Sequence, residues 1–297
     1  MTSTISEMTD SLPFEIVDVF AQSRYQGNPL AVFHNAADLS PNEMQSIALE
    51  TNFSETTFIC GGDINNGFDV RIFTPTHEMP FAGHPTLGTA AVLRGLLSKD
   101  NKPRPSRVTL NLTVGAVPVD FAGELAWLTS PPITIRQQID RSSVAHALGL
   151  NESALDPAYP VELVSSGPDY VMIPMTSLDA LETAQLDLAA FAPLAAAGVP
   201  VHLYLFAQGG RDPDRDMTVR LFFEAGGLRE DPATGSAACC LGGYLLAHPL
   251  LDTHDIDITL AQGALIRRPS ILHLRASSQR IEVGGQVTPV ASGQWLR

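Results

Sequence analysis

The chain has 297 residues, of which 44% are hydrophobic, and it carries a formal net charge of −14 at pH 7. This length predicts two domains or one large one, and the hydrophobic fraction is sufficient for a sizeable core. No basic stripe is present to neutralise phosphates, so we expect no nucleic-acid partner.

The cysteines and the first residues indicate the compartment. Cys60, Cys239 and Cys240 form an odd set with two adjacent members, a poor disulfide framework that indicates a reducing environment. Residues 1–10 are polar and acidic, unlike a signal peptide. No apolar run approaches the roughly 18 residues of a membrane span. The sequence therefore predicts a cytoplasmic protein without membrane contact, and its Cys and His spacing predicts no metal site.

In the first half, alternating or β-rich stretches predict strands at residues 14–20, 30–34, 53–60 and 68–73. Ser40, Pro41 and Glu43 combine a capping serine, a first-turn proline and a capping box, which predict a helix that continues to residue 51. Residues 87–97 are apolar on nearly every face, which is typical of a buried helix. Residues 108–121 read as a hairpin with Gly115 at its turn.

The second half follows a predicted linker at residues 122–138. It contains a short helix at 144–150, a strand at 170–175, helical pieces within 177–197, and strands at 201–207 and 217–223. Residues 235–247 form a second apolar helix rich in small residues. Strands fill the remainder, with turns expected near Gly263 and at Gly284 and Gly285.

A block of sequence occurs twice, at residues 71–91 and 220–238. Each copy begins with Arg, an aliphatic residue and Phe, and ends with a polar residue, Pro, two residues, Gly, a hydroxyl residue and two Ala. The repeat predicts two similar domains. Each half is rich in strands and contains one apolar helix lined with small residues, so we expect an α+β fold in which a curled, mostly antiparallel β-sheet encloses a central apolar helix in each domain. We expect the domains to span residues 1–125 and 126–297, and the last strand could return to the first domain.

The two helix starts in the repeat are candidate binding sites. The first N–H groups of a helix lack internal partners and can bind a carboxylate or phosphate, although the same residues also serve as ordinary capping and turn residues. His84 and Asp231 occupy matched positions in the two copies. His84 is either a core histidine or a general acid, and Asp231 is either a helix-stabilising acid or a functional carboxylate.

Glu55 is the third candidate. Strand alternation would place it on one face with Phe53 and Thr57, where a partly apolar cleft would raise its pKa and favour proton transfer near neutral pH. The alternative is an edge-strand glutamate that faces water. A racemase of the two-thiol type would need a cysteine in each half, but position 84 is histidine. Cys239 and Cys240 lie in an apolar helix, where inert thiols are expected.

Four motifs resemble the PhzF-like family of phenazine biosynthesis. They are Gly27-Asn28-Pro29, Asn52-Phe53-Ser54-Glu55, Gly83-His84-Pro85-Thr86 and Asp231-Pro232-Ala233-Thr234-Gly235-Ser236. The resemblance implies a diaminopimelate-epimerase-like fold of two pseudo-symmetric domains, each a β-barrel-like sheet around a central helix, with the site between them. It also implies a homodimer and a cofactor-free isomerase that acts on a small carboxylate. It implies that Glu55 shuttles the proton and that His84 and Asp231 position and polarise the substrate. It also implies a set of substrate-binding residues, which are Asn28, Ser54, Gly83, Gly235 and Ser236.

Two other functions stay open at this point. The first is an epimerase or racemase of an amino-acid-like carboxylate, with a carboxylate as the base in place of a thiol pair. The second is a catalytically silent protein of the same fold that binds a small molecule. A silent binding protein should keep its ligand affinity when Glu55 is replaced by Gln.

Overall fold

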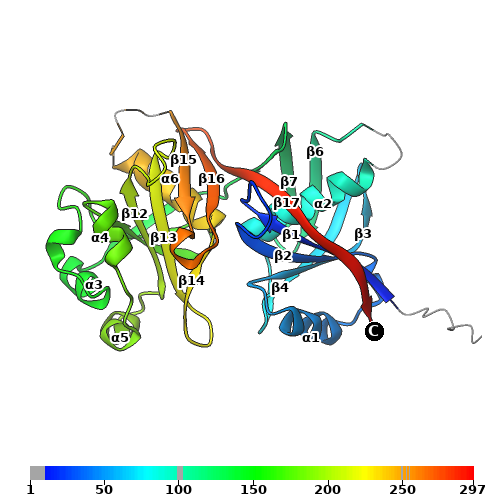
Figure 1. Ribbon diagram of the computed structural model, residues 1–297, viewed down its shortest axis with the longest axis horizontal. Coiled ribbons are helices and arrows are strands. Elements are labelled where there is room, and N and C mark those ends of the chain that lie inside the picture. The colour runs from blue at the N-terminus through cyan, green and yellow to red at the C-terminus, as the bar shows by residue number, and fades with distance from the viewer. Residues whose placement is uncertain (1–10, 99–102, 249, 252, 254) are drawn as a thin grey trace, which may run out of the picture.

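The computed structural model describes residues 11–98, 103–248, 250–251, 253 and 255–297, so the expectation for residues 1–10 lies outside the described residues. Two lobes lie side by side, the first half of the chain in one and most of the second half in the other (Figure 1). The last strand runs from the second lobe across the first.

The first half contains β1 (Ser11–Val19), β2 (Asn28–Phe33), α1 (Pro41–Thr51), β3 (Thr56–Asp63), β4 (Gly67–Phe73), β5 (Glu78–Met79), α2 (Gly83–Leu97), β6 (Arg107–Leu112), β7 (Gly115–Ala122) and β8 (Leu125–Thr129). The second half contains β9 (Thr134–Gln138), α3 (Arg141–Ala147), β10 (Glu162–Ser165), β11 (Asp169–Pro174), α4 (Leu178–Thr183), α5 (Leu188–Ala196), β12 (His202–Gln208), β13 (Met217–Glu224), β14 (Leu228–Asp231), α6 (Gly235–Ala247), β15 (Ile256–Gln262), β16 (Ser270–Ala276) and β17 (Ile281–Leu296). Short 3₁₀ turns occur at Ala36–Asp38, Glu152–Ala154 and Ala264–Ile266.

The two halves share one strand topology. In the first, β1–β2 is antiparallel, β2–β3 parallel, β3–β4 antiparallel and β4–β6 parallel. In the second, β10–β11, β11–β12, β12–β13 and β13–β15 follow the same order of directions. Antiparallel strands complete each half, and one apolar helix, α2 or α6, packs against each sheet. The predicted α+β fold of two pseudo-symmetric, curled sheets is confirmed.

The repeated Arg-aliphatic-Phe segments play the same part in both lobes. Arg71 on β4 forms a bidentate ion pair with Glu78 on β5, and its guanidinium carbon lies 5.1 Å from the centre of the Phe73 ring. Arg220 on β13 likewise pairs with Glu230 on β14, and its guanidinium is 4.5 Å from the Phe222 ring. The sequence repeat is therefore also a structural repeat.

Small residues allow the central helices to lie close to their sheets. A Cβ atom at Gly88 would lie 2.5 Å from Leu30 Cδ2 and 2.8 Å from Val19 Cγ2. The equivalent Gly235 on α6 faces the Phe20 ring, with 3.2 Å to its Cζ. Both repeated glycines therefore serve packing, and the predicted role of Gly235 in admitting a ligand has to rest on its backbone N–H.

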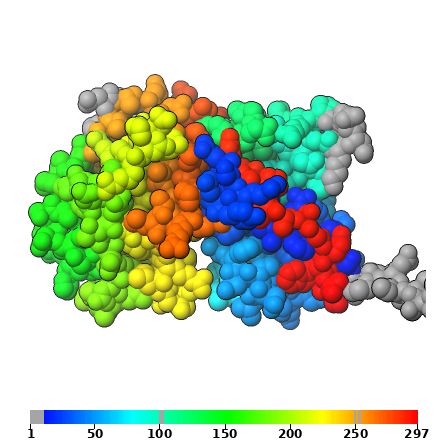
Figure 2. All heavy atoms as spheres, in the orientation of Figure 1, coloured from blue at the N-terminus to red at the C-terminus, as the bar shows by residue number. Residues whose placement is uncertain are grey.

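Strand β17 ties the lobes together. Its first part pairs with β16 and β8, and its remainder pairs with β1 from Val19↔Val287 to Ser11↔Leu296. A second connection crosses in the other direction, because β9 follows β8 of the first lobe in the chain and pairs with β10 of the second lobe. Figure 2 shows the red C-terminal residues lying over the blue first strand.

Several predicted boundaries are wrong. Gly284 and Gly285 form no turn but lie inside β17, where Cβ atoms would come within 2.6 Å of the Trp127 ring and 2.4 Å of the Phe20 ring. The predicted linker at 122–138 contains β8 and β9, because Pro131 and Pro132 interrupt the strands only locally. The predicted strand at 53–60 begins at Thr56, so Glu55 precedes it. The first buried helix begins at Gly83, ahead of the predicted residue 87, and α3 spans 141–147 instead of 144–150.

Candidate functional site

The central helices meet at their N-termini. A Cβ atom at Gly83, the first residue of α2, would lie 3.4 Å from the backbone nitrogen of Ser236 in the first turn of α6. Within the described part of the chain, neither helix has a capping side chain, whereas α1, α3, α4 and α5 are capped by Ser40, Asp140, Ser177 and Asp187. Their first N–H groups therefore remain available, and the helix dipoles favour an anion between them.

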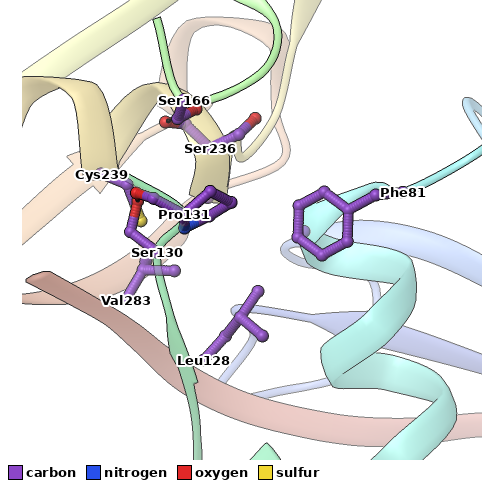
Figure 3. A pocket seen from close by; sticks show the side chains of 10 residues that line it. Phe81, Leu128, Ser130, Pro131, Ser166, Ser236, Cys239 and Val283 are labelled. Carbon is purple, nitrogen blue, oxygen red and sulfur yellow. Dashed lines mark hydrogen bonds between the residues drawn. The ribbon is translucent and has the colours of Figure 1, made fainter. Parts of the chain in front are cut away.

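A narrow pocket of about 10 Å³ lies at this junction, roughly the space of one water molecule. Its lining residues are Phe81, Gly83, Leu128, Ser130, Pro131, Ser166, Gly235, Ser236, Cys239 and Val283. Figure 3 shows Ser166 and Ser236 together on the α6 side, with the Phe81 ring facing them from the α2 side and Leu128 below. Two serines thus lie on one side of the pocket, opposite the aromatic ring of Phe81.

Glu55 and His84 form the centre of the candidate site. Glu55 Oε2 lies 3.5 Å from His84 Nε2, and the side chains are 16% and 7% exposed. Neither of these two atoms has a hydrogen-bond partner among the described residues. The predicted placement of Glu55 by strand alternation was wrong, yet the loop before β3 still brings it into a buried setting.

Burial sets the protonation of this pair. It raises the pKa of Glu55 to about 8, with the nearby charge of Asp231 as a second cause. Burial also lowers the pKa of His84 to about 3, although a hydrogen bond to the Pro29 carbonyl opposes that shift. At neutral pH the two groups are therefore a neutral imidazole beside a mostly protonated carboxyl group, and not an ion pair.

Asp231 is held at the end of β14. Asn28 Nδ2 donates to Asp231 Oδ1 at 3.0 Å, and the Thr234 hydroxyl donates to Asp231 Oδ2. Burial raises the pKa of Asp231 to about 7, because desolvation outweighs these two hydrogen bonds. The sequence repeat predicted both His84 and Asp231 at a helix start. His84 does lie in the first turn of α2, but Asp231 precedes α6.

Gln262 on β15 supports this arrangement from behind. Its Nε2 donates to the Asp231 carbonyl at 2.9 Å, and its Oε1 accepts from the Thr234 N–H at 3.1 Å. Asn28 also donates to the Ala233 carbonyl at 2.9 Å, so the segment between β14 and α6 is fixed on both sides.

Arg268 fixes the loop that carries Asn28. Its Nη2 donates to Asp18 Oδ1 and to the Gln26 carbonyl, both at 2.6 Å, and its Nε donates to the Gly27 carbonyl at 2.9 Å. In Figure 2, blue residues of the first lobe lie against orange residues of the second. A residue of the second lobe thus positions Asn28 in the first.

The structure places the predicted residues as follows. Four of the predicted residues contact one another or alter one another's pKa: Glu55, His84, Asp231 and Asn28. Three others line the pocket: Gly83, Gly235 and Ser236. Ser54 lies in the bend before Glu55 and is not among the lining residues. Sequence reasoning missed Phe81, Ser166, Tyr170, Thr234 and Gln262. Only Thr234 carried a signal, as part of the repeated motif.

The cysteines agree with the expectation of unreactive thiols. All three are free, and burial raises the pKa of both Cys239 and Cys240 to about 12. Cys239 nevertheless lines the pocket, which its place within an apolar helix had not predicted.

A larger cavity of about 320 Å³ lies behind the site, where Gln262 forms part of its wall. Its charged side chains are paired with one another, as Arg220 with Glu230, Arg211 with Glu182 and Arg215 with Asp212. The uncapped helix ends lie at the smaller pocket, and His84 in the first turn of α2 brings Glu55 close to them. Glu55, His84 and Asp231 are not themselves among the residues that line this pocket.

Two kinds of structure are absent from the described residues. These residues contain no group of three His, Cys, Asp or Glu side chains arranged to hold a metal ion. They also contain no helix both long and apolar enough to cross a membrane. The homodimer and the cytoplasmic location stay predictions.

Known proteins resemble this chain over nearly its whole length. The sequence model of the phenazine biosynthesis-like protein family (PhzC-PhzF) matches residues 17–293. Trans-2,3-dihydro-3-hydroxyanthranilate isomerase of Pseudomonas aeruginosa is 34% identical over 291 residues, which cover 95% of this chain and 98% of that protein. An uncharacterised isomerase of Pasteurella multocida is 35% identical over 286 residues, covering 95% and 93%.

Solved structures agree. A predicted epimerase of Pseudomonas aeruginosa superposes with a TM-score of 0.80 at 32% identity, covering 97% of this chain and all of the other. A PhzF-family protein of Bacillus anthracis gives 0.85 at 23% identity and covers 97% and 99%, a likeness of fold alone. A probable proline racemase of Agrobacterium radiobacter shares the fold at 0.62 and 11% identity, covering 96% and 92%. From its sequence and its fold, the chain belongs to the phenazine biosynthesis-like, or PhzF, family of isomerases.

Proposed function

We propose that this small-molecule isomerase moves a proton on a small carboxylate substrate by acid/base catalysis in the cleft between the lobes, without a cofactor. One observation carries the proposal: the two helix N-termini that lack capping side chains face each other, beside Glu55, whose buried Oε2 has no hydrogen-bond partner among the described residues. The helix ends supply an anion site, and the carboxyl group supplies the base.

The proton transfer has two balanced halves. Ionised Glu55 removes a proton from a substrate carbon, and the electron pair of the broken C–H bond moves into the adjacent π system. The protonated Glu55 then donates the same proton to another carbon, where that electron pair forms the new C–H bond. A positioned acid/base of this type typically contributes about 10²–10⁴-fold to the rate.

The neighbouring groups have separate tasks. The free N–H groups of Gly83, Gly235 and Ser236 bind the substrate carboxylate and stabilise charge that moves toward it. His84, neutral at pH 7, donates or accepts a hydrogen bond at the reacting part of the substrate. Asp231, oriented by Asn28 and Thr234, binds a polar substituent such as an amino group.

An epimerase is the second candidate, since a structure named as a predicted epimerase is 32% identical to this chain. The same base would then serve a proton that returns to its original carbon from the other face. A hydrogen shift and an epimerisation give different products, so product analysis separates them.

The test is turnover of trans-2,3-dihydro-3-hydroxyanthranilate, the compound named for a relative, within a panel of cyclic and α-amino carboxylates. Conversion is followed by NMR with wild type, Glu55→Gln and the control Glu50→Gln, which alters an exposed residue of α1. We expect wild type and Glu50→Gln to convert one compound at similar rates, and Glu55→Gln to lose at least about 10²-fold. Equal rates in all three would refute the role of Glu55. Binding without conversion across the panel would favour a silent binding protein.

A further inference from the structure

Tyr170 contacts the pocket through Ser236. Its hydroxyl lies 2.6 Å from Ser236 Oγ, and the tyrosine, on β11, is only 6% exposed. Ser236 lies in the first turn of α6 and lines the pocket, whereas Tyr170 itself is not among the lining residues. Any influence of Tyr170 on a ligand is therefore exerted through the serine.

The hairpin of β10 and β11 holds Ser236 at a second point. Ser166, in the turn of that hairpin, donates from its Oγ to the Ser236 carbonyl at 3.2 Å. Figure 3 shows Ser166 and Ser236 adjacent on the same wall. The hairpin thus fixes both the backbone and the side chain of Ser236, and only the tyrosine contact acts on the hydroxyl.

The hydrogen-bonding capacity of the two hydroxyls decides the direction of the contact. Each has one proton to donate. Burial raises the pKa of Tyr170 far above its usual value, so its proton stays in place at any working pH. If Ser236 donates to an anion in the pocket, its proton is used there, and Tyr170 must be the donor in the contact between them. When Tyr170 donates to Ser236 and Ser236 donates to the anion, the first hydrogen bond polarises the second, so the bond from Ser236 to the anion becomes stronger.

We propose that Tyr170 is a positioning residue that orients the Ser236 hydroxyl as a hydrogen-bond donor for the substrate carboxylate. This inference rests on the carboxylate site of the proposed function. It implies that Tyr170 contributes more to the binding of ligands with an ionised carboxyl group than to the binding of neutral analogues of the same shape.

The test measures binding of anthranilate and of its neutral analogue 2-aminobenzamide by isothermal titration calorimetry. The proteins are wild type, Tyr170→Phe, Ser236→Ala and the double variant. We expect Tyr170→Phe to weaken anthranilate binding about threefold to tenfold, the usual effect of one oriented hydrogen bond, and to weaken 2-aminobenzamide binding less, because a neutral carbonyl forms a weaker hydrogen bond than a carboxylate. In the Ser236→Ala background, the effect of Tyr170→Phe should vanish, because its route to the ligand is gone.

Tyr244→Phe is the matched control. It removes a hydroxyl from another buried tyrosine of the same core, whose partner is the Pro160 carbonyl at 2.7 Å, away from the pocket. It should lose stability like Tyr170→Phe but bind anthranilate like wild type. Equal weakening in both phenylalanine variants, an effect that persists without Ser236, or equal losses for both ligands would overturn the inference. If wild type does not bind anthranilate, both this inference and the proposed carboxylate site are refuted. The proton-transfer role of Glu55 is tested separately, by turnover of Glu55→Gln.

Discussion

At the scale of single residues, Glu55 combines burial with proximity to two other polar groups. Its carboxyl is near His84 and is affected by the charge of Asp231, so three titratable groups share one buried region. Burial pushes the carboxyl pKa values of Glu55 and Asp231 up and the imidazole pKa of His84 down. Such opposed shifts within one cleft are typical of acid/base sites.

The raised pKa of Glu55 predicts a pH-dependent stability difference. Between its ordinary pKa of 4.5 and its folded value of about 8, the folded chain keeps a proton that the unfolded chain has released. The free energy of unfolding therefore falls as pH rises through this window, by at most about 1.4 kcal/mol per pH unit. Glu55→Gln has no such proton to lose. We expect urea unfolding to show the variant gaining stability over wild type between pH 5 and pH 8.5, and a constant difference would contradict the buried state.

The same pKa predicts the activity profile. If ionised Glu55 is the base, kcat/KM should rise with pH and level off above about 8, since this ratio reports the free enzyme. A steady-state profile from pH 5 to 10 on the converted substrate measures it. A profile that is flat from pH 6 to 9 would show that this carboxyl group does not control the reaction.

Gly83 gives a residue-scale test of the anion site. Alanine there would put a methyl group 3.4 Å from Ser236 N and cover the gap between the helix ends. We expect Gly83→Ala to weaken anthranilate binding at least about tenfold through loss of hydrogen bonds to an anion, while the melting temperature stays the same or rises. Gly95→Ala is the control on the same helix, because its Cβ would meet nothing within 4 Å. Similar binding by both variants would count against the helix ends as the carboxylate site.

At the scale of elements, the loop between β1 and β2 connects the lobes to the site. Arg268 binds two of its carbonyl groups and Asp18, and the next residue, Asn28, holds Asp231. Lysine cannot reproduce this forked contact.

We therefore expect Arg268→Lys to loosen Asn28 and raise the pKa of Asp231, since the Asn28 hydrogen bond lowers that pKa. NMR titration of the carboxyl carbon would measure the shift, and turnover should fall more than stability. Arg267→Lys, at the exposed neighbouring position, is the control. An unchanged Asp231 titration in Arg268→Lys would show that the loop is held by other contacts.

The elements also show what the sequence could predict. Ser40, Pro41 and Glu43 predicted the start of α1, and both hydrogen bonds of the capping box are present, because the contacts are local. Gly284 and Gly285 looked like a turn, but their absent side chains make room for Trp127 and Phe20, far away in the chain. The hydrophobic periodicity of the sequence predicted the strands and the buried helices. It could not predict features that depend on residues far away in the chain.

The residues of the candidate site also divide into those that the sequence predicted and those that it did not. Glu55, His84 and Asp231 were found through motifs and the repeat, although strand alternation misplaced Glu55. Tyr170 and Gln262 were missed because they reach the site from strands whose sequences contain no motif. Their role follows only from how β11 and β15 lie against the start of α6 and the segment before it.

At the scale of the whole molecule, β17 links the two lobes. Its second part is the antiparallel neighbour of β1 along its whole length, and Trp295 packs 6.0 Å from the Phe14 ring and 5.4 Å from the Phe33 ring. Removing residues 287–297 would expose one edge of β1 and open this aromatic cluster.

We expect this truncation to speed amide hydrogen exchange in β1 and β2 and to leave β15 and β16 protected, because those strands keep their own pairing. Hydrogen-exchange mass spectrometry distinguishes the outcomes. Equal loss of protection in both lobes would show that they fold as one unit, and no loss in β1 would show that the last strand contributes little.

The proton shuttle by Glu55 between two positions of a bound carboxylate is the step on which the proposed function depends. Its most direct test is exchange in D₂O, with wild type and Glu55→Gln each incubated with trans-2,3-dihydro-3-hydroxyanthranilate and the carboxylate panel and monitored by NMR. Deuterium should enter one compound with wild type and not with Glu55→Gln, while the variant still binds it. Deuterium entering at the same rate with both proteins would contradict the claim.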